Sequence, residues 1–192
     1  MAVCACRSQL FPGCRRATRM TSPAAVFVLL VVLGQTSVLL GANIAKGGKV
    51  TQSSVGWAGV PERAVDGKRA NRYAQGSCSH TRRETTPWWR LDLLKTFTIK
   101  TVTVTNRRDC CHDRINGAEI RIGNSLDANG NDNPKCAVVS SMAAGASKTF
   151  ACNGMEGRYV TVVIPGRQKI LTLCEVEVTG TETGDSGQNV CG

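Results

Sequence analysis

The segment from Thr101-Val-Thr-Val-Thr105 through a charged loop to Ala118-Glu-Ile-Arg-Ile122 carries the clearest structural pattern in this chain. Polar and apolar residues alternate in both arms, and the second arm turns Ile120 and Ile122 to one face and Arg121 to the other. Alternation with a period of two is typical of β-strands that have one buried face. The segment therefore predicts two strands joined by a tight loop.

Further strand patterns lie on both sides of this segment, and we find no long amphipathic helix and no internal repeat. Clusters of turn-forming residues, such as Asn129-Gly-Asn-Asp-Asn-Pro134 and Asn153-Gly154, separate the strands. Many short strands at this spacing predict an all-β fold, a two-sheet β-sandwich or jelly roll. The additional strands are expected at 88–93, 159–164 and 173–178.

The first 42 residues have the composition of a secretory signal peptide. Residues 1–23 contain four arginines and no acid, an apolar run follows over 24–33, and small residues come next. This order is typical of a leader that is removed. Cleavage is expected after Ala42, and Met20 is a second candidate for the true start. An uncleaved membrane anchor is the alternative, although the apolar run is short for a span and Gly34-Gln35 interrupts it.

Removal of the leader leaves residues 43–192, which is enough chain for one domain. The domain is expected over 43–180 and a flexible tail over 181–192. The formal net charge falls from +10 to +6, with charges scattered along the chain. No basic stripe alternates with aromatic residues, so nucleic acid is not an expected partner. A solvated basic surface and a binder of sulfated or other anionic glycans both remain open.

The cysteine content agrees with an oxidising compartment. Of ten cysteines, three lie in the leader and seven remain. Secreted proteins pair such cysteines, which leaves one unpaired. The odd residue is expected to be Cys191 in the tail, where it would bridge two chains, carry a small thiol or stay free. No zinc motif is present, and His80 and His112 are the only histidines.

The loop itself holds adjacent cysteines, Cys110 and Cys111, between Arg107 and Arg114. A disulfide between neighbours closes no long loop, so it adds little stability, but it makes a rigid, sulfur-faced surface. Arginine forks beside an apolar surface suit a ligand with one apolar face and several hydroxyls, such as a sugar. The alternative is that the cysteines pair elsewhere or stay free.

Three further residues belong to this hypothesis. Asp109 and Asp113 are placed to orient the arginines, although a surface ion-pair network explains the same pattern. His80, two residues after Cys78, offers a ring that donates to or accepts from a hydroxyl. A structural or exposed histidine is the simpler alternative for His80.

The spacing of His80, Arg107, Asp109 and Arg114 resembles that of the F-type lectins, or fucolectins. The resemblance extends along nearly all of 43–180. It implies a galactose-binding-domain-like β jelly roll that binds fucose without changing it, and hence no enzyme. The segments that carry it include Pro87-Trp-Trp-Arg-Leu-Asp-Leu93, Arg114-Ile-Asn-Gly-Ala-Glu-Ile-Arg-Ile-Gly123, Met155-Glu-Gly-Arg-Tyr-Val160 and Ile170-Leu-Thr-Leu-Cys-Glu-Val176.

The resemblance also assigns roles to individual residues. His80, Arg107 and Arg114 would hydrogen-bond the axial hydroxyl, a neighbouring hydroxyl and the ring oxygen of fucose. The Cys110–Cys111 disulfide would lie against the sugar ring. The other implied disulfides are Cys78–Cys174 and Cys136–Cys152.

A calcium site is implied in the same way. Calcium takes several oxygen ligands from a turning chain, and Val65-Asp-Gly-Lys68 offers such a turn. The expected role of the ion is to order the loop before the sugar site. Its ligands would be the carboxylates of Asp66 and Glu175, Ser77 through its hydroxyl and carbonyl, and the carbonyls of Arg63, Lys68 and Cys174.

The resemblance to the family predicts a secreted agglutinin that recognises fucosylated glycans, chiefly those on microbes. The protein is expected to form a homo-oligomer and not to insert into membranes. One departure is Arg108, which stands where many relatives carry glycine. A glycoside hydrolase is the enzymatic alternative, but it needs two carboxylates across a cleft. A polyanion binder is the other alternative, and it would use Arg82, Arg83, Arg107 and Arg108.

Overall fold

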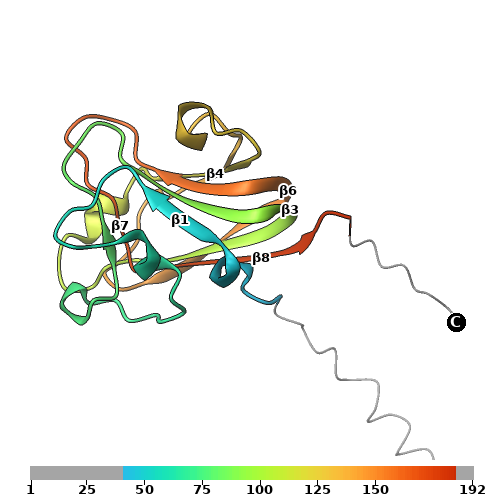
Figure 1. Ribbon diagram of the computed structural model, residues 1–192. Helices are drawn as coiled ribbons and strands as arrows, with labels where there is room; N and C mark the ends of the chain where they lie inside the picture. Colours follow the sequence, from blue (N-terminus) through green and yellow to red (C-terminus); the bar gives the residue numbers. More distant parts are fainter. Residues whose placement is uncertain (1–40, 185–192) are drawn as a thin grey trace, which may run out of the picture. The chain divides into compact units, whose positions relative to one another are not determined.

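A computed structural model describes residues 41–184, and these residues form an all-β sandwich, as the sequence predicts (Figure 1). The only helices in this part are short 3-10 turns, and none is long and apolar enough to cross a membrane. The leader, the tail and Cys191 lie outside the described residues. The strands are β1 (Lys49–Gln52), β2 (Ser79–His80), β3 (Trp88–Thr105), β4 (Glu119–Gly123), β5 (Lys135–Val138), β6 (Ser147–Val163), β7 (Thr172–Leu173) and β8 (Glu175–Glu182). The 3-10 turns are η2 (Ile44–Gly47), η3 (Pro61–Ala64), η4 (Tyr73–Gln75), η5 (His112–Ile115) and η6 (Asp127–Gly130).

Two long antiparallel strands, β3 and β6, form the frame of the sandwich. The main sheet has the order β1-β3-β6-β4-β5, and β8 pairs with the second half of β3. Register shifts near the middle of the β3–β6 pair divide each strand into two halves. The first half of β3 therefore pairs with β1 and the second half with β8, so that the same strand contributes to both layers.

One of the predicted turns is a bulge instead. Asn153 and Gly154 have positive φ angles of 52° and 77°, but they lie inside β6, where the register with β3 shifts. Sequence reasoning read these residues as a turn because left-handed Asn-Gly pairs are typical of hairpins. Here the pair lets β6 bend from one layer to the other.

The two layers share one hydrophobic core. Trp89 from the first half of β3, Val102 from the second half, and Ile120 from β4 are all fully buried in the same cluster. Each such side chain contributes about 1.5–3 kcal/mol relative to an exposed position. The buried face of 118–122 is the face that the alternation predicts.

A small second sheet, β2–β7, lies at one end of the sandwich among the loops (Figure 1). It pairs His80 with Thr172, and the adjoining disulfide links Cys78 to Cys174 across a sequence separation of 96 residues. This pairing fixes His80 at the edge where the charged loop 106–117 also lies. A second disulfide, Cys136–Cys152, links β5 to β6.

Candidate functional site

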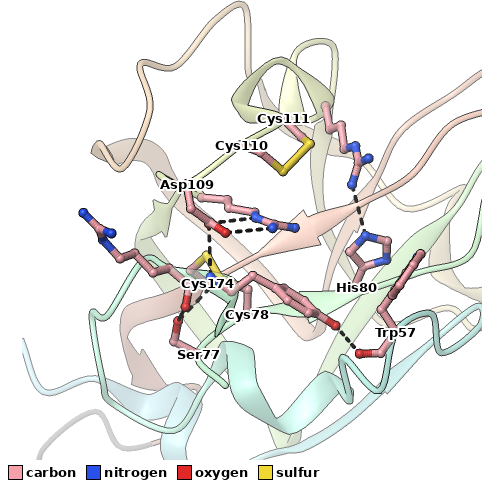
Figure 2. Close-up of polar contacts among 12 residues, drawn as sticks. Trp57, Ser77, Cys78, His80, Asp109, Cys110, Cys111 and Cys174 are labelled. Atoms are coloured by element: carbon pink, nitrogen blue, oxygen red, sulfur yellow. Dashed lines mark hydrogen bonds and ion pairs between the residues drawn. A yellow bond between two sulfur atoms is a disulfide. The ribbon is translucent and has the colours of Figure 1, made fainter. Parts of the chain in front are cut away.

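A pocket of about 270 Å³ opens where the loops meet β2. The structure brings His80, Arg107, Arg114 and Cys110 together in its wall, and Cys111 is bonded to Cys110. In Figure 2 the sulfur atoms of this disulfide lie across from His80 and Trp57. The complete lining is Trp57, Tyr73, His80, Arg107, Cys110 and Arg114.

The loop that carries four of the predicted residues is closed by a buried asparagine at its base. The side-chain amide nitrogen of Asn106 donates to the carbonyls of His112, Met142 and Ala143 at 3.1, 3.3 and 3.3 Å. At the tip, Cys111 takes a left-handed conformation, with φ 57°, and starts the turn η5. These bonds hold the neighbouring cysteines and arginines in one fixed arrangement.

Arg107 is fixed by an acid and an aromatic ring. Its Nε and Nη2 donate to the two carboxylate oxygens of Asp109 at 2.9 and 2.8 Å, and its guanidinium lies 4.5 Å from the centre of the Tyr73 ring. The backbone N–H of Tyr73 also donates to Asp109, at 3.1 Å. The hydrogen bonds from Arg107 hold the pKa of Asp109 well below its usual range. The predicted orienting role of Asp109 is therefore visible in the geometry.

His80 is buried, and its two ring nitrogens have different partners. Nδ1 lies 2.6 Å from the carbonyl of Thr81, and Nε2 lies 3.0 Å from Nη1 of Arg114. A carbonyl only accepts and a guanidinium only donates, so the proton is on Nδ1 and Nε2 is an acceptor. Burial lowers the pKa of His80, and the charges of Arg114 and Arg107 lower it further against the raising effect of the Thr81 bond. The ring is therefore held neutral.

Arg114 has no carboxylate partner among residues 41–184. Burial lowers its pKa, and the positive charges of Arg107 and Arg83 lower it further. Asp113, the other predicted orienting acid, lies 3.1 Å from His112 and is 79% exposed. It orients neither arginine, because its side chain points toward His112 rather than across the loop.

Sequence reasoning did not assign two aromatic residues of the pocket to the site, although the family resemblance associates their loops, 55–60 and 73–75, with sugars beyond fucose. Trp57 is 84% exposed and has a φ of 53°, and Tyr73 donates a short hydrogen bond from its hydroxyl to the Trp57 carbonyl. The available signal was a tryptophan in the glycine-containing segment Val55-Gly-Trp-Ala-Gly-Val60, which indicates a turn but not a partner. The pairing of the two loops is visible only in three dimensions.

Arg108 does not line the pocket. Its backbone N–H donates to the carbonyl of Asn71 at 2.7 Å, and its Cβ lies beside Gly145. It is absent from the residues with positive φ, so this position places no demand on glycine. The loop therefore accommodates the arginine without a left-handed backbone conformation at this position.

The predicted calcium ligands include an unusual carboxylate. Glu175 is fully buried, and its Oε1 accepts from the backbone N–H of Gly67 at 3.1 Å, whereas its Oε2 has no partner. Burial raises the pKa of Glu175 to about 8, and the negative charges of Asp66 and Glu177 act in the same direction.

A buried carboxylate oxygen without a partner is costly, and a hard cation is the natural remedy. Ser77 and Glu175 are the chain neighbours of Cys78 and Cys174, which the disulfide joins. The Ser77 hydroxyl donates to the carbonyl of Arg72 at 2.8 Å. Within the described part of the chain no group of three or more His, Cys, Asp or Glu side chains gathers. The predicted set has only two carboxylates and otherwise a hydroxyl and carbonyls, and it stays a prediction.

Comparisons with known proteins place this geometry among relatives. Residues 63–162 match the family described as NedA-like, galactose-binding domain. Fucolectin-1 of Anguilla japonica is 52% identical over 142 residues, which cover 71% of this chain and 79% of the relative.

Two solved structures are also similar. The f-lectin (fucolectin) from the serum of the striped bass, Morone saxatilis, has a TM-score of 0.72 and 57% identity, over 74% of this chain and 48% of that one. A Streptococcus pneumoniae fucose binding module has a TM-score of 0.64 and 32% identity, over 72% of this chain and 95% of that one. This chain thus spans about half the length of the bass protein.

Proposed function

The chain belongs to the F-type lectin (fucolectin) family, and from this premise we propose that it is a secreted lectin whose pocket binds terminal L-fucose. The observation that carries the proposal is the convergence of His80, Arg107, Arg114 and Cys110 in one pocket. The family consists of carbohydrate-binding proteins rather than enzymes, which confirms the expectation that this chain is not an enzyme.

The pocket offers a donor and acceptor set that suits vicinal hydroxyls. Arg107 and Arg114 donate only, so they would bond hydroxyl oxygens and the ring oxygen. His80 Nε2 accepts only, so it would accept a hydrogen bond from a hydroxyl, in place of the bond that Arg114 now donates to it. A sugar whose hydroxyl points elsewhere would leave these buried groups without partners, and this supports selection of fucose over glucose.

The apolar parts of the pocket suit the rest of the sugar. The disulfide sulfur of Cys110 would lie against the ring face, and the aromatic side chains of Trp57 and Tyr73 would contact the methyl group of fucose. Burial of one methyl contributes about 0.8 kcal/mol. Such a contact separates fucose from sugars that carry a hydroxymethyl group.

Calcium is the proposed cofactor, held by Asp66, Ser77 and Glu175 together with the carbonyls of Arg63, Lys68 and Cys174. The unpartnered Oε2 of Glu175 supports this assignment. Bound calcium would supply positive charge that neutralises the buried carboxylate and orders the preceding loop. That loop includes Tyr73, whose N–H and ring hold Asp109 and Arg107 in place.

Secretion, oligomerisation and defence complete the proposal. The bass relative comes from serum, which supports an extracellular role for this chain. Single sugar sites bind weakly, so agglutination of microbial surfaces would need several sites in one assembly. A homo-oligomer would provide them, and Cys191 is the candidate for a bridge between chains.

Calorimetric titration of the oxidised, secreted protein with L-fucose and with D-glucose, in calcium, tests the proposal. We expect saturable binding of fucose and no response to glucose. Arg114→Ala should weaken fucose binding roughly 100-fold, because it removes donors to the sugar and the partner of His80. Arg167→Ala, a change at an exposed arginine that does not line the pocket, serves as the control. A folded, calcium-loaded protein that does not bind fucose would overturn the assignment.

A further inference from the structure

The sugar pocket continues into a wider groove. A second pocket, of about 650 Å³, shares Trp57, His80 and Arg114 with the first. A third, of about 270 Å³, shares Arg83, Arg114 and Ile170 with the second. The three therefore form one continuous depression. The outer groove, as we call the part beyond the sugar pocket, is lined by Val55, Arg82, Arg83, Lys169 and Ile170 together with Trp57.

The outer groove is rich in positive charge that the protein does not neutralise. Arg82, Arg83 and Lys169 have no carboxylate within ion-pair distance among residues 41–184, and neither has the adjoining Arg114. The charge of Arg83 reaches Arg114, since it contributes to the lowered pKa of that guanidinium. In contrast, Arg107 in the sugar pocket is already paired with Asp109. Unpaired cations gathered along a groove favour an anionic ligand.

Acids near the groove do not cancel this charge. Asp113 lines the far end, but it is 79% exposed and lies 3.1 Å from Nε2 of His112. Glu84 follows Arg83 in sequence, yet one of its oxygens accepts from the hydroxyls of Ser53 and Ser54, at 2.5 and 2.8 Å. Glu84 thus holds the loop beneath the groove in place.

The groove is also held rigidly enough to act as a site. The backbone N–H of Arg82 donates to the Ser54 hydroxyl at 2.9 Å, and its Nε donates to the carbonyl of Val55 at 3.3 Å. Glu84 and Lys169 exchange two backbone hydrogen bonds, at 3.0 and 2.9 Å. The two cationic segments are therefore joined to each other by the Glu84–Lys169 bridge, and Arg82 is joined to the loop that carries Val55, which reduces the ordering cost of binding.

We propose that the outer groove binds an anionic substituent, a sulfate ester or a carboxylate, on the sugars attached to fucose. This inference rests on the proposed function, because fucose in the first pocket would place the next sugar beside Trp57, which lines both pockets. The volume of the middle section falls within the range of about 300–1,000 Å³ that is typical of ligand pockets. Val55 and Ile170 would contact the apolar face of the sugar, and Arg83 and Lys169 would donate to the anionic oxygens.

Calorimetry with three ligands tests the proposal: a neutral fucosylated trisaccharide, its sulfated derivative and its sialylated derivative. We expect at least one anionic form to bind roughly threefold to tenfold more tightly than the neutral form at low salt, as partly exposed charge-assisted hydrogen bonds allow. The advantage should shrink as salt rises. Arg83→Gln and Lys169→Gln should each reduce it, and the double variant should abolish it.

Arg167→Gln is the matched control, because it removes one charge from the same loop as Lys169 but does not line the groove. It should keep the preference for the anionic form. Equal affinity of the wild-type protein for neutral and anionic forms would overturn the inference, as would an equal loss in Arg167→Gln, which would indicate non-specific attraction.

Failure of the proposed function gives a different result. A protein that binds neither free fucose nor the neutral trisaccharide but binds a sulfated or sialylated form through Arg83 would overturn fucose recognition and support the anion site. Binding of none of the ligands would overturn both. A preference for only the sulfated or only the sialylated form would support the inference and identify the source of the anionic group.

Discussion

The ion pair between Arg107 and Asp109 leads to a sharp prediction about sugar affinity. In Asp109→Asn, the Oδ1 acceptor remains for Tyr73 and for Nε of Arg107, but an amide NH₂ replaces the oxygen that Nη2 now contacts at 2.8 Å. Two donors then face each other, so the guanidinium must turn away. Asp109 therefore acts as a positioning residue rather than as a ligand of the sugar.

The magnitude follows from the burial of the pair. The side chains of Arg107 and Asp109 are 12% and 27% exposed, which is between a surface ion pair and a buried one. Exposed pairs contribute about 0.2–1 kcal/mol, and hydrogen bonds to charged groups contribute about 1.5–3 kcal/mol. A loss of about 2 kcal/mol corresponds to roughly 30-fold weaker fucose binding.

Calorimetric titration with L-fucose measures this loss, and a double-mutant cycle assigns its cause. If Asp109 acts through Arg107, the Arg107→Lys and Asp109→Asn changes together should weaken binding little more than the stronger single change. Asp132→Asn removes one exposed carboxylate far from the pocket and should leave the affinity within about twofold. Unchanged affinity in Asp109→Asn, or simple addition of the two losses, would refute the reasoning.

Three other predictions concern protonation and the disulfides. Because the pKa of His80 lies below its ordinary value of 6.5, fucose affinity should stay constant down to that pH and fall only at lower pH, where protonation makes Nε2 a donor. Calorimetric titrations at a series of pH values from neutral to acid measure the midpoint of this fall, and a midpoint above 6.5 would contradict the assignment of a neutral ring. The pKa of Glu175 is about 8 in the folded protein and has an ordinary value of 4.5. Between these two pH values only the folded state keeps the proton, so the free energy of unfolding of the calcium-free protein should fall as pH rises through this range. Calcium should remove that trend in thermal melts, and a calcium-free protein that gains stability over the same range would argue against the assignment. Replacing Cys136 and Cys152, which are 16 residues apart, with serines should lower the free energy of unfolding by about 3 kcal/mol in denaturant titrations. Replacing Cys110 and Cys111 with serines should instead weaken sugar binding at nearly unchanged stability. The reverse pattern would contradict the role of the Cys110–Cys111 disulfide as a surface for the sugar ring.

The strands whose buried face carries several branched apolar residues could be predicted from the sequence, and those with a weaker apolar pattern could not. The alternation in 101–105 and 118–122 and the apolar run in 159–164 all fall in strands of the structure. Sequence reasoning did not find β1, β5 or the first half of β6. The sequence Lys49-Val-Thr-Gln52 of β1 is only partly buried, and it becomes a strand because the edge of β3 provides hydrogen-bond partners far away in the chain. Such tertiary pairing leaves little trace in local composition.

The residues of the candidate site could likewise be predicted only in part. The adjacent cysteines and their flanking arginines are local in sequence, so a sugar-binding loop could be proposed from residues 107–114 alone. His80 joins them only through β2–β7, and Trp57 and Tyr73 only through contacts between loops. The proposed calcium ligands Asp66 and Glu175 were accessible only through resemblance to the family, because nothing local links positions so far apart.

The long-range pairing of β2 also has a consequence for how and when the molecule becomes active. His80 pairs with Thr172, and the disulfide beside it spans 96 residues. Contacts of such separation form late, because the intervening chain must first be made and brought together. A nascent chain therefore lacks the proposed sugar site until β7 has been synthesised and oxidation has joined Cys78 to Cys174. If the protein is the proposed secreted fucose lectin, retention on a fucose column would report completed synthesis and correct oxidation together. Partly made chains would then not engage the fucosylated glycans around them.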